Sequence, residues 1–438
     1  MSANPFFRSI PRSVVLAVLM MANAGRAQET TTSSTAFSST GPLTLAGVLA
    51  RAAENNPALA AQSYGERAAE ALIEQAGLRP NPTLDVTAEN FLGTGNVQGV
   101  RSLETTVQAS QTFERGGKRD RRVALASRER ETAAKEFAVR RAEVLAASAV
   151  AYVETLAAQE RLALAEEPLT LARETLAVVD ARVKEGAASP AESARARASL
   201  ASAQGEFARA QAALSSARAS LAAMWGGRAE EVGMLSGKIF VPETLPGEEV
   251  FLAQIARHPR FEFQQAVIEG RRASLELEKA QAAQDVTVGG GVRFLREGTD
   301  AAFVAGVSIP LPVRNKNQGN IRAARETLSG AEQSMRAVEA ELRANVTAAW
   351  QELAAAHTTA QTLRRDALPA TEEAYAVVRR AYEEGQLPLI DVLDAQRALV
   401  SLRREILDAE SAYAVALTRV EGLTNPAFTL TTALVSAQ

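Results

Sequence analysis

Two aspartates near the end of the sequence are spaced so that their carboxylates could face a cation together. Asp391 and Asp394 belong to the stretch AYEEGQLPLIDVLDAQ (381–396), where a glycine and a proline interrupt a long helical pattern. Residues three apart share one face of a helix, and a narrow ring of carboxylates selects for cations. The dipole of a first helical turn would also favour Asp391, whereas Asp394 lies beyond that turn. Asp391 is therefore either a helix-end acid or part of a cation path.

An earlier segment, RVKEGAASPAESA (182–194), repeats this spacing with a single acid, Glu192. Ser189, Pro190 and Glu192 fit a capping box, with serine as N-cap, proline as first helical residue and glutamate at N3. Glu192 is expected either to cap its helix or to occupy the place that Asp391 has in the later segment.

The sequence offers no residue set for catalysis or for a bound metal. It contains two histidines and no cysteine, so a His/Cys metal cluster cannot form. We expect His258 to start a helix and His357 to be a tunnel or packing residue. The segment GGGVR (289–293) lies in a strand pattern without the Lys-Ser or Lys-Thr of a P-loop. A net charge of -3 gives no field for nucleic acid. We expect neither an enzyme nor a cofactor, and no nucleic-acid partner.

The first residues have the pattern of a secretory signal peptide. Arg8 and Arg12 precede an apolar run at 14–21, and small residues fit a cleavage site after Ala27. We expect residues 1–27 to be a signal peptide and the polar residues 28–42 to be a disordered linker. A short membrane anchor is the alternative, but no run in the chain approaches the ~20 apolar residues that a membrane helix needs.

The rest of the chain is a tandem duplication of about 200 residues. Three landmarks return at nearly one offset: VVDARVKEG (178–186) as VVRRAYEEG (377–385), QTFERGGKRDRRVALASRE (111–129) as IPLPVRNKNQGNIRAARE (309–326), and Asn56-Pro57 as His258-Pro259. Each half is predicted to run helix, strand, strand, long helix, turn, helix.

The first helix of each half is predicted at about 45–79, with Thr44 as its N-cap, and at about 248–282. Much longer helices, rich in alanine and mixed charge, are predicted at about 116–185 and 317–385. Seventy helical residues reach about 105 Å, which is rare in globular domains.

Two prolines, Pro168 and Pro369, lie at matching depths in the long helices, and each is expected to kink its helix. The repeated apolar spacing, with much alanine, favours close coiled-coil packing. Taken alone, the helices fit a soluble coiled-coil rod equally well.

Four segments of about ten residues alternate apolar and polar residues, as tilted membrane strands do. They lie at about 83–91, 101–113, 285–296 and 301–311. Four strands cannot close a barrel, and an open edge is forbidden in lipid, so several chains must pool their strands. Two chains would give a filled eight-stranded barrel and three a twelve-stranded barrel with a lumen. Two hairpins packed on a soluble helical domain are the alternative.

The transitions from strand to long helix fit the margin of a barrel. Pro310 and Pro312 end one strand, since proline cannot donate to a ladder. Gly116 and Gly117 follow another strand, within a basic cluster. Basic residues oppose the dipole at a helix start, so the cluster either meets lipid headgroups or is simply solvated.

The duplicated plan resembles that of the TolC-type outer-membrane efflux factors. The residues of the second half that fit the family pattern are Tyr382, Gly385, Asp391, Val392, Leu393, Asp394 and Ala395. SQTFERGGKRDRR (110–122) and IPLPVRNKNQGNIRAA (309–324) are most similar to the CzcC-like branch, which serves heavy-metal resistance-nodulation-division pumps. The resemblance covers about 43–424.

The resemblance implies a mixed fold of helices and membrane strands. A homotrimer would form a twelve-stranded outer-membrane barrel continued by a periplasmic helical barrel about 100 Å long. The implied parts are a first repeat (43–226) with a tip turn at about 186–189, an equatorial connection (227–247), a second repeat (248–424) with a tip turn at about 385–388, and a C-terminal tail (425–438).

Carried over by position, Gly385 and Gly186 are the tip turns and Asp391 and Asp394 line the constriction, with Glu192 equivalent to Asp391. In a trimer the two aspartates would place six carboxylates around one axis. The family arginine that locks the aperture is replaced here by Leu387. A gate held by that ion pair is therefore not expected.

We thus expect a passive channel in the bacterial outer membrane, most of it in the periplasm. An inner-membrane resistance-nodulation-division pump and a periplasmic adaptor would deliver heavy-metal cations to its tip, and outer-membrane lipid would surround its strands. A drug-efflux or type I secretion duct of the same fold is the nearest alternative. A soluble periplasmic coiled-coil adaptor or scaffold is the alternative of another class.

Overall fold

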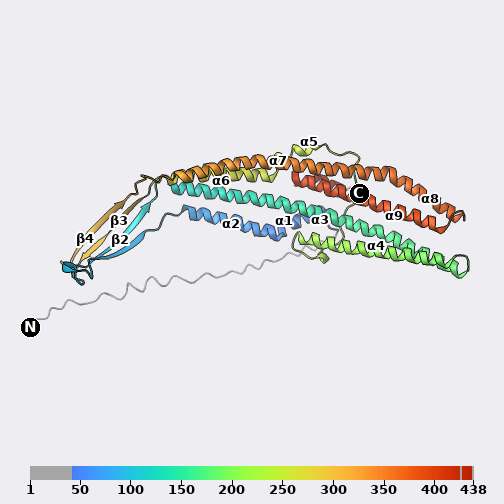
Figure 1. Cartoon of the computed structure of the whole chain (residues 1–438), viewed down its shortest axis with the longest axis horizontal. Coiled ribbons are helices and arrows are strands. Elements are labelled where there is room, and N and C mark those ends of the chain that lie inside the picture. The colour runs from blue at the N-terminus through green and yellow to red at the C-terminus, as the bar shows by residue number, and fades with distance from the viewer. Residues whose placement is uncertain (1–41, 425–426, 437–438) are drawn as a thin grey trace, which may run out of the picture. The chain divides into compact units, whose positions relative to one another are not determined.

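The computed structural model describes residues 42–424 and 427–436. The predicted signal peptide (1–27) and the linker up to residue 41 lie outside the described residues. The chain divides into two units, 1–41 and 42–438, and every element below belongs to the second. In it, a four-stranded sheet is joined to long helices that reverse direction at two turns (Figure 1).

The first helix is broken where one continuous helix was predicted. Helix α1 (Leu45–Asn55) ends and α2 (Pro57–Gly77) begins at Asn56, whose Oδ1 accepts from two backbone N–H groups of α2 at 2.9 and 3.1 Å. The prediction of one helix over about 45–79 is wrong because the residue before a proline avoids the helical conformation. Thr44 is the N-cap of α1, as predicted.

The second repeat is broken in the same way. Helix α5 (Glu248–Leu252) and a 3₁₀ turn (Ile255–Arg257) precede α6 (Pro259–Gln281), so one helix over about 248–282 is also wrong. His258 is the N-cap of α6, as predicted, and its Nδ1 accepts from a backbone N–H at 3.1 Å. Burial lowers the pKa of this imidazole, which keeps the ring neutral as an acceptor.

The long helices differ between the repeats. Helix α3 (Lys118–Lys184) is one helix of 67 residues that continues through Pro168. Its counterpart is α7 (Gln318–Thr362), a π-helical turn (Leu363–Ala367) and α8 (Leu368–Glu383). The π turn ends two residues before Pro369, where wider hydrogen bonding accommodates the missing N–H. The return helices are α4 (Pro190–Ala223) and α9 (Leu389–Thr424).

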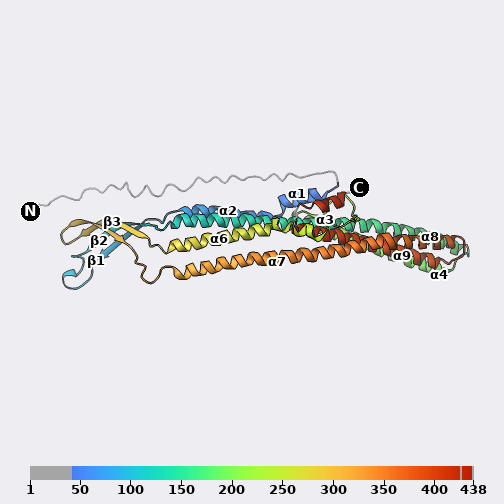
Figure 2. The ribbon, with the colours of Figure 1, turned by 90° about the horizontal axis from the view of Figure 1, so that it is seen from above.

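Helix α3 is the central element of the helical packing. It contacts α1, α2, α4, α6 and α9, while α7 contacts α6 and α9. Helices α2 and α4 lie one after the other along α3, and Asn56 Nδ2 donates to the carbonyl of Met224 at their junction, at 2.8 Å (Figures 1 and 2). Helices α6 and α9 follow each other likewise between α3 and α7.

The four strands form one antiparallel sheet in the order β1-β2-β3-β4. Their bounds are β1 Thr83–Glu89, β2 Glu104–Phe113, β3 Val286–Leu295 and β4 Asp300–Ser308. Hairpins join β1 to β2 and β3 to β4, so the central pair β2–β3 joins the two repeats. Within the described residues, the outer edges of β1 and β4 have no strand partner.

One face of the sheet is apolar and exposed. The register aligns the alternating apolar residues predicted from the sequence, such as Val107 opposite Val292 and Val288 opposite Val307. Phe303 is 94% exposed and Leu84 71%. The opposite face is polar and includes Arg293, which pairs with Glu104 at 3.1 Å. If water contacted both faces of the sheet, this apolar area would be exposed to it, which soluble proteins rarely allow.

Residues 227–247 cross the helices as an extended connection held by side chains. Tyr152 Oη of α3 donates to the carbonyl of Ser236 at 2.6 Å. On α7, His357 Nε2 donates to the carbonyl of Pro242 at 2.9 Å, and its ring lies 5.7 Å from that of Tyr413. Of the two predicted roles of His357, packing is therefore confirmed.

The predicted C-terminal tail contains a helix, α10 (Thr429–Ser436), held by a buried carboxylate. Glu421, 1% exposed, accepts from the N–H groups of Leu430 and Thr431 at 2.8 and 2.7 Å, and from the Thr431 hydroxyl at 2.6 Å. Burial and this carboxylate raise the pKa of Tyr413 to about 12. Across residues 42–424 and 427–436, no helix is both long and apolar enough to span a bilayer.

We predict that Glu421→Ala lowers the free energy of unfolding by about 3 kcal/mol, because it leaves the donors at the start of α10 unpaired in the core. Denaturant unfolding followed by the helical circular dichroism signal measures the change. Glu352→Ala is the matched control, since Glu352 is 65% exposed and lies 3.8 Å from Arg419. Equal midpoints for the two variants would contradict the prediction.

Candidate functional site

The two tip turns (residues 185–189 and 384–388) reverse the chain with the same backbone geometry. In each, the N–H of the residue after the glycine donates to the carbonyl five residues earlier, at 2.8 Å. Gly186 and Gly385 have φ of +74° and +77°, in the left-handed region that favours glycine. This is the Schellman cap. The structure thus places both glycines at chain reversals.

Glu192 is part of the cap of α4. Its Oε1 accepts from the N–H of Ser189 at 3.3 Å, and the Ser189 hydroxyl accepts from the first turn of α4 in return. Pro190 is the first helical residue. The predicted capping box is therefore present, and one oxygen of Glu192 is engaged in it.

The two predicted aspartates have different surroundings at the start of α9. Asp391 is half-buried in the first turn, where its N–H donates to the carbonyl of Pro388 at 3.1 Å. Asp394 Oδ1 accepts from Arg397 Nη1 at 3.0 Å, and both of these side chains are about 60% exposed. Sequence reasoning missed Arg397, although the Asp-x-x-Arg spacing was its signal.

A hydrogen bond between the two tip turns was also missed. Arg182 Nη1, in the last turn of α3, donates to the Tyr382 hydroxyl in the last turn of α8 at 2.9 Å. Leu387, at the position where the resemblance implies a locking arginine, is half-buried and contributes no charge. The arginine that joins the turns therefore comes from the first repeat.

Above the first tip turn, a polar bridge holds α3 to α4. The Ser193 hydroxyl donates to Asp180 Oδ1 at 2.5 Å and accepts from Arg197 Nη2 at 3.2 Å. Ser193 is 4% exposed. In the second repeat the equivalent residue is Val392, so this bridge belongs to the first helical pair alone.

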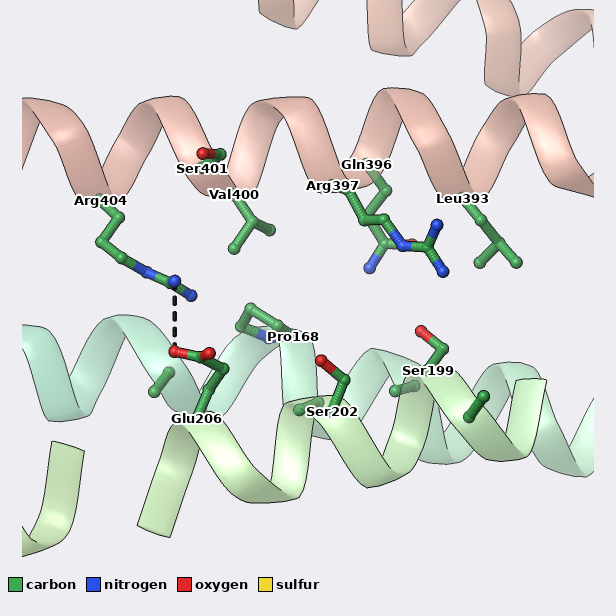
Figure 3. Close-up of a pocket in the computed structure, with 14 residues that line it drawn as sticks. Pro168, Ser199, Ser202, Glu206, Leu393, Gln396, Arg397, Val400, Ser401 and Arg404 are labelled. Atoms are coloured by element: carbon green, nitrogen blue, oxygen red, sulfur yellow. Dashed lines mark ion pairs between the residues drawn. The ribbon is translucent and has the colours of Figure 1, made fainter. Parts of the chain in front are cut away.

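A groove of about 360 Å³ lies between α4 and α9, with Pro168 of α3 at its base (Figure 3). Ser199 and Ser202 face it from α4, and Arg397 reaches toward it from α9. An ion pair of Glu206 with Arg404, at 3.2 Å, crosses the groove at one end. From this ion pair toward the tip turns, the groove separates α4 from α9.

Further ion pairs from the same segment of α9 reach α3. Arg403 lies 3.2 Å from Glu167, and Asp408 lies 2.8 Å from Arg161. Two residues after Asp408, Glu410 accepts from Arg364 of the π turn at 2.5 Å. Burial raises the pKa of Glu410, and Arg364 opposes that shift. Residues 403–410 of α9 therefore contact α3 of the first repeat and the π turn of the second, close to Pro168 and Pro369.

The predicted strand-to-helix transitions have no regular secondary structure. Gly116 and Gly117 both have positive φ, and a Cβ on Gly116 would lie 2.6 Å from that of Ala283, so the close approach excludes a side chain. Pro310 and Pro312 lie beyond the last residue of β4, outside the ladder, as predicted. In the parts of the chain that the structure describes, no three His, Cys, Asp or Glu side chains gather as a metal site requires.

Comparisons with known proteins agree with this arrangement. A family model described as outer membrane efflux protein matches residues 48–227 and 253–425. The chain is 30% identical over 364 residues to the cobalt-zinc-cadmium resistance protein CzcC of Cupriavidus metallidurans, covering 83% of this chain and 85% of that protein. It is 33% identical over 292 residues to the nickel and cobalt resistance protein CnrC of the same bacterium, covering 66% and 68%.

A solved structure of CusC has a similar fold. Its TM-score is 0.68 at 18% identity, over 86% of this chain and 91% of that one. The two matched segments of the family model coincide with the two repeats, which supports the duplication inferred from the sequence.

We predict that Tyr382→Phe loosens the contact between the tip turns, because Arg182 loses its acceptor. The contact contributes about 1 kcal/mol, so the fold should be kept. The chain has no cysteine, so spin labels on Ala187→Cys and Gln386→Cys are the only two labels in each chain. Pulsed electron resonance should show a broader distance distribution in Tyr382→Phe.

Tyr64→Phe is the control for this experiment, since Tyr64 is an exposed tyrosine of α2 without a bond to either turn. An unchanged distribution in Tyr382→Phe would show that Arg182 does not hold the turns together.

Proposed function

The chain belongs to the outer membrane efflux protein family, and from that premise we propose that it forms the outer-membrane duct through which a tripartite pump expels heavy-metal cations. Members of this family are channels of the outer membrane. The proposal adds the cargo, the assembly and the residues at the aperture.

The carrying observation is the sheet with one exposed apolar face and two unpaired edges. In lipid, each unpaired backbone group costs several kcal/mol, so β1 of one chain must meet β4 of another. Three chains then pool twelve strands around a lumen, whereas two would fill the interior with side chains. The polar face with Arg293 and Glu104 lines that lumen.

The helices continue the duct. At 1.5 Å per residue, α3 spans about 100 Å, enough to carry the lumen far from the membrane. The tip turns then lie at the end away from the sheet, where a periplasmic adaptor and an inner-membrane pump would meet the channel. The channel has no chemistry to perform, so it conducts passively.

Two features favour cations as the cargo. The relatives CzcC and CnrC are named for resistance to cobalt, zinc, cadmium and nickel. Asp391 and Asp394 would place six carboxylates around the axis of a trimer. Arg397 offsets the charge of Asp394 in part, which leaves Asp391 as the main cation-attracting acid of each chain.

We predict that purified protein forms cation-preferring channels in planar bilayers, and that Asp391→Asn/Asp394→Asn weakens the preference. A carboxylate in wet surroundings attracts a monovalent cation by about 1 kcal/mol, so the ratio of cation to anion permeability should fall about fivefold. Reversal potentials under a salt gradient measure this ratio.

Glu373→Gln is the control, because it removes an exposed acid of α8 away from the turn. The aperture assignment fails if the double variant keeps the selectivity of the wild type. The duct itself fails if no channel forms.

We predict that cells lacking this protein lose tolerance to one or more of zinc, cobalt, cadmium, nickel and copper. Complementation with the wild-type gene should restore growth, because export needs the outer-membrane exit. Growth across a concentration series of each metal, with a drug panel in parallel, measures this. Sensitivity to drugs with unchanged metal tolerance would instead support a drug-efflux duct.

A further inference from the structure

Two hollows lie at corresponding places in the repeats, where the sheet gives way to the long helices. The first junction (residues 113–119) borders a hollow of about 440 Å³ whose lining includes Phe113, Arg79 and Arg119. The second junction (residues 309–317) borders one of about 530 Å³ lined by Leu311, Val313 and Arg314. Each hollow combines apolar and basic side chains.

The apolar part continues the exposed face of the sheet. Phe113 is the last residue of β2 on that face and is 55% exposed. Beyond β4, Ile309, Leu311 and Val313 are 49%, 79% and 78% exposed. The apolar band therefore extends past the last strand pair, to the level of both junctions.

The basic part is in excess over its local acids. Lys118 lies 2.8 Å from Asp285, Arg119 lies 3.8 Å from Asp120, and Arg122 pairs with Glu114, so the nearby acids already have partners. Other basic side chains at the junctions are exposed and form no ion pair with any residue that the structure describes: Arg79, Arg115, Arg314 and Lys316. Their positive charge is therefore available to an anionic group outside the chain.

The helix dipole does not explain why basic residues occur at these two junctions. Basic residues in and before the first turn of a helix oppose its dipole, at a cost of some tenths of a kcal/mol each. Both repeats nevertheless place them there, immediately after the apolar band. At the boundary of a membrane, Arg and Lys beside an apolar surface are positioned for lipid phosphates.

We propose that the two hollows bind the phosphate groups of anionic glycerophospholipids in the leaflet nearest the helices. Arg79 holds one headgroup and Arg314 holds the other, and the exposed Arg115 and Lys316 add positive charge beside them. Phe113 and Leu311 meet the acyl chains. The inference rests on the proposed barrel, which puts the apolar face in lipid.

The test uses the full-length channel in lipid nanodiscs that contain phosphatidylglycerol and phosphatidylcholine. After transfer to detergent, native mass spectrometry counts the lipids retained. The wild type should retain phosphatidylglycerol preferentially. In Arg79→Gln/Arg314→Gln, which removes one basic residue from each hollow, the preference should fall about fivefold at each site, since each basic residue near an anionic surface contributes about fivefold in binding.

Arg296→Gln is the matched control, because Arg296 is an exposed arginine in the hairpin at the other end of β3 and β4. It should keep the preference. Equal retention by the wild type and the double variant overturns the proposal. So does an equal loss in Arg296→Gln, or displacement of the lipid by inorganic phosphate, which would indicate a site for free phosphate.

Bilayer conductance of the same preparations separates this inference from the proposed function. Channels with no lipid preference would refute the lipid sites alone. Absence of channels in the wild type would refute the barrel, and the lipid sites with it.

Discussion

The unbroken course of α3 is the constraint on which most of the other packing depends. Its 67 residues link the sheet to the first tip turn without a change of helix type, and Pro168 does not end it. Helices α1, α2, α4, α6 and α9 all contact it, and Tyr152 holds the connection between the repeats. The second repeat has no such continuous helix, because the π turn divides α7 from α8. The first repeat therefore has one continuous long helix, whereas the long helix of the second repeat is interrupted by a π turn.

This difference extends to the tip. The first return helix begins with a complete capping box, and the Asp180–Ser193 bridge ties it to α3. The second begins with two acids. Asp394 is paired with Arg397, whereas the side chain of Asp391 forms no ion pair with any residue that the structure describes. A fixed first helical pair and a less constrained second pair suit the proposed aperture, in which both aspartates come from the second repeat.

Much of the fold could be predicted from the sequence, because its signals are periodic. Strand alternation gave the faces of the sheet, and the repeated landmarks gave the order of elements. The breaks at Asn56 and His258 were missed, although each precedes a proline, because helical periodicity continues on both sides. The contact between Arg182 and Tyr382 could not be read from either segment, since their residues meet only when two turns 200 positions apart are brought together.

The contacts of α8 and α9 with the first repeat, from the groove to the tip, have a thermodynamic consequence. Arg404, Arg403 and Asp408 bind through exposed ion pairs, and Arg182 through an exposed hydroxyl. These polar contacts bury little apolar area of their own, so they contribute little to the heat-capacity change of separating the helices. The strength of the contact instead falls as ionic strength rises, because salt screens exposed charges, with a screening length of about 8 Å at physiological concentration. The electrostatic attraction between the two helical pairs therefore depends on the ionic strength of the surrounding solution.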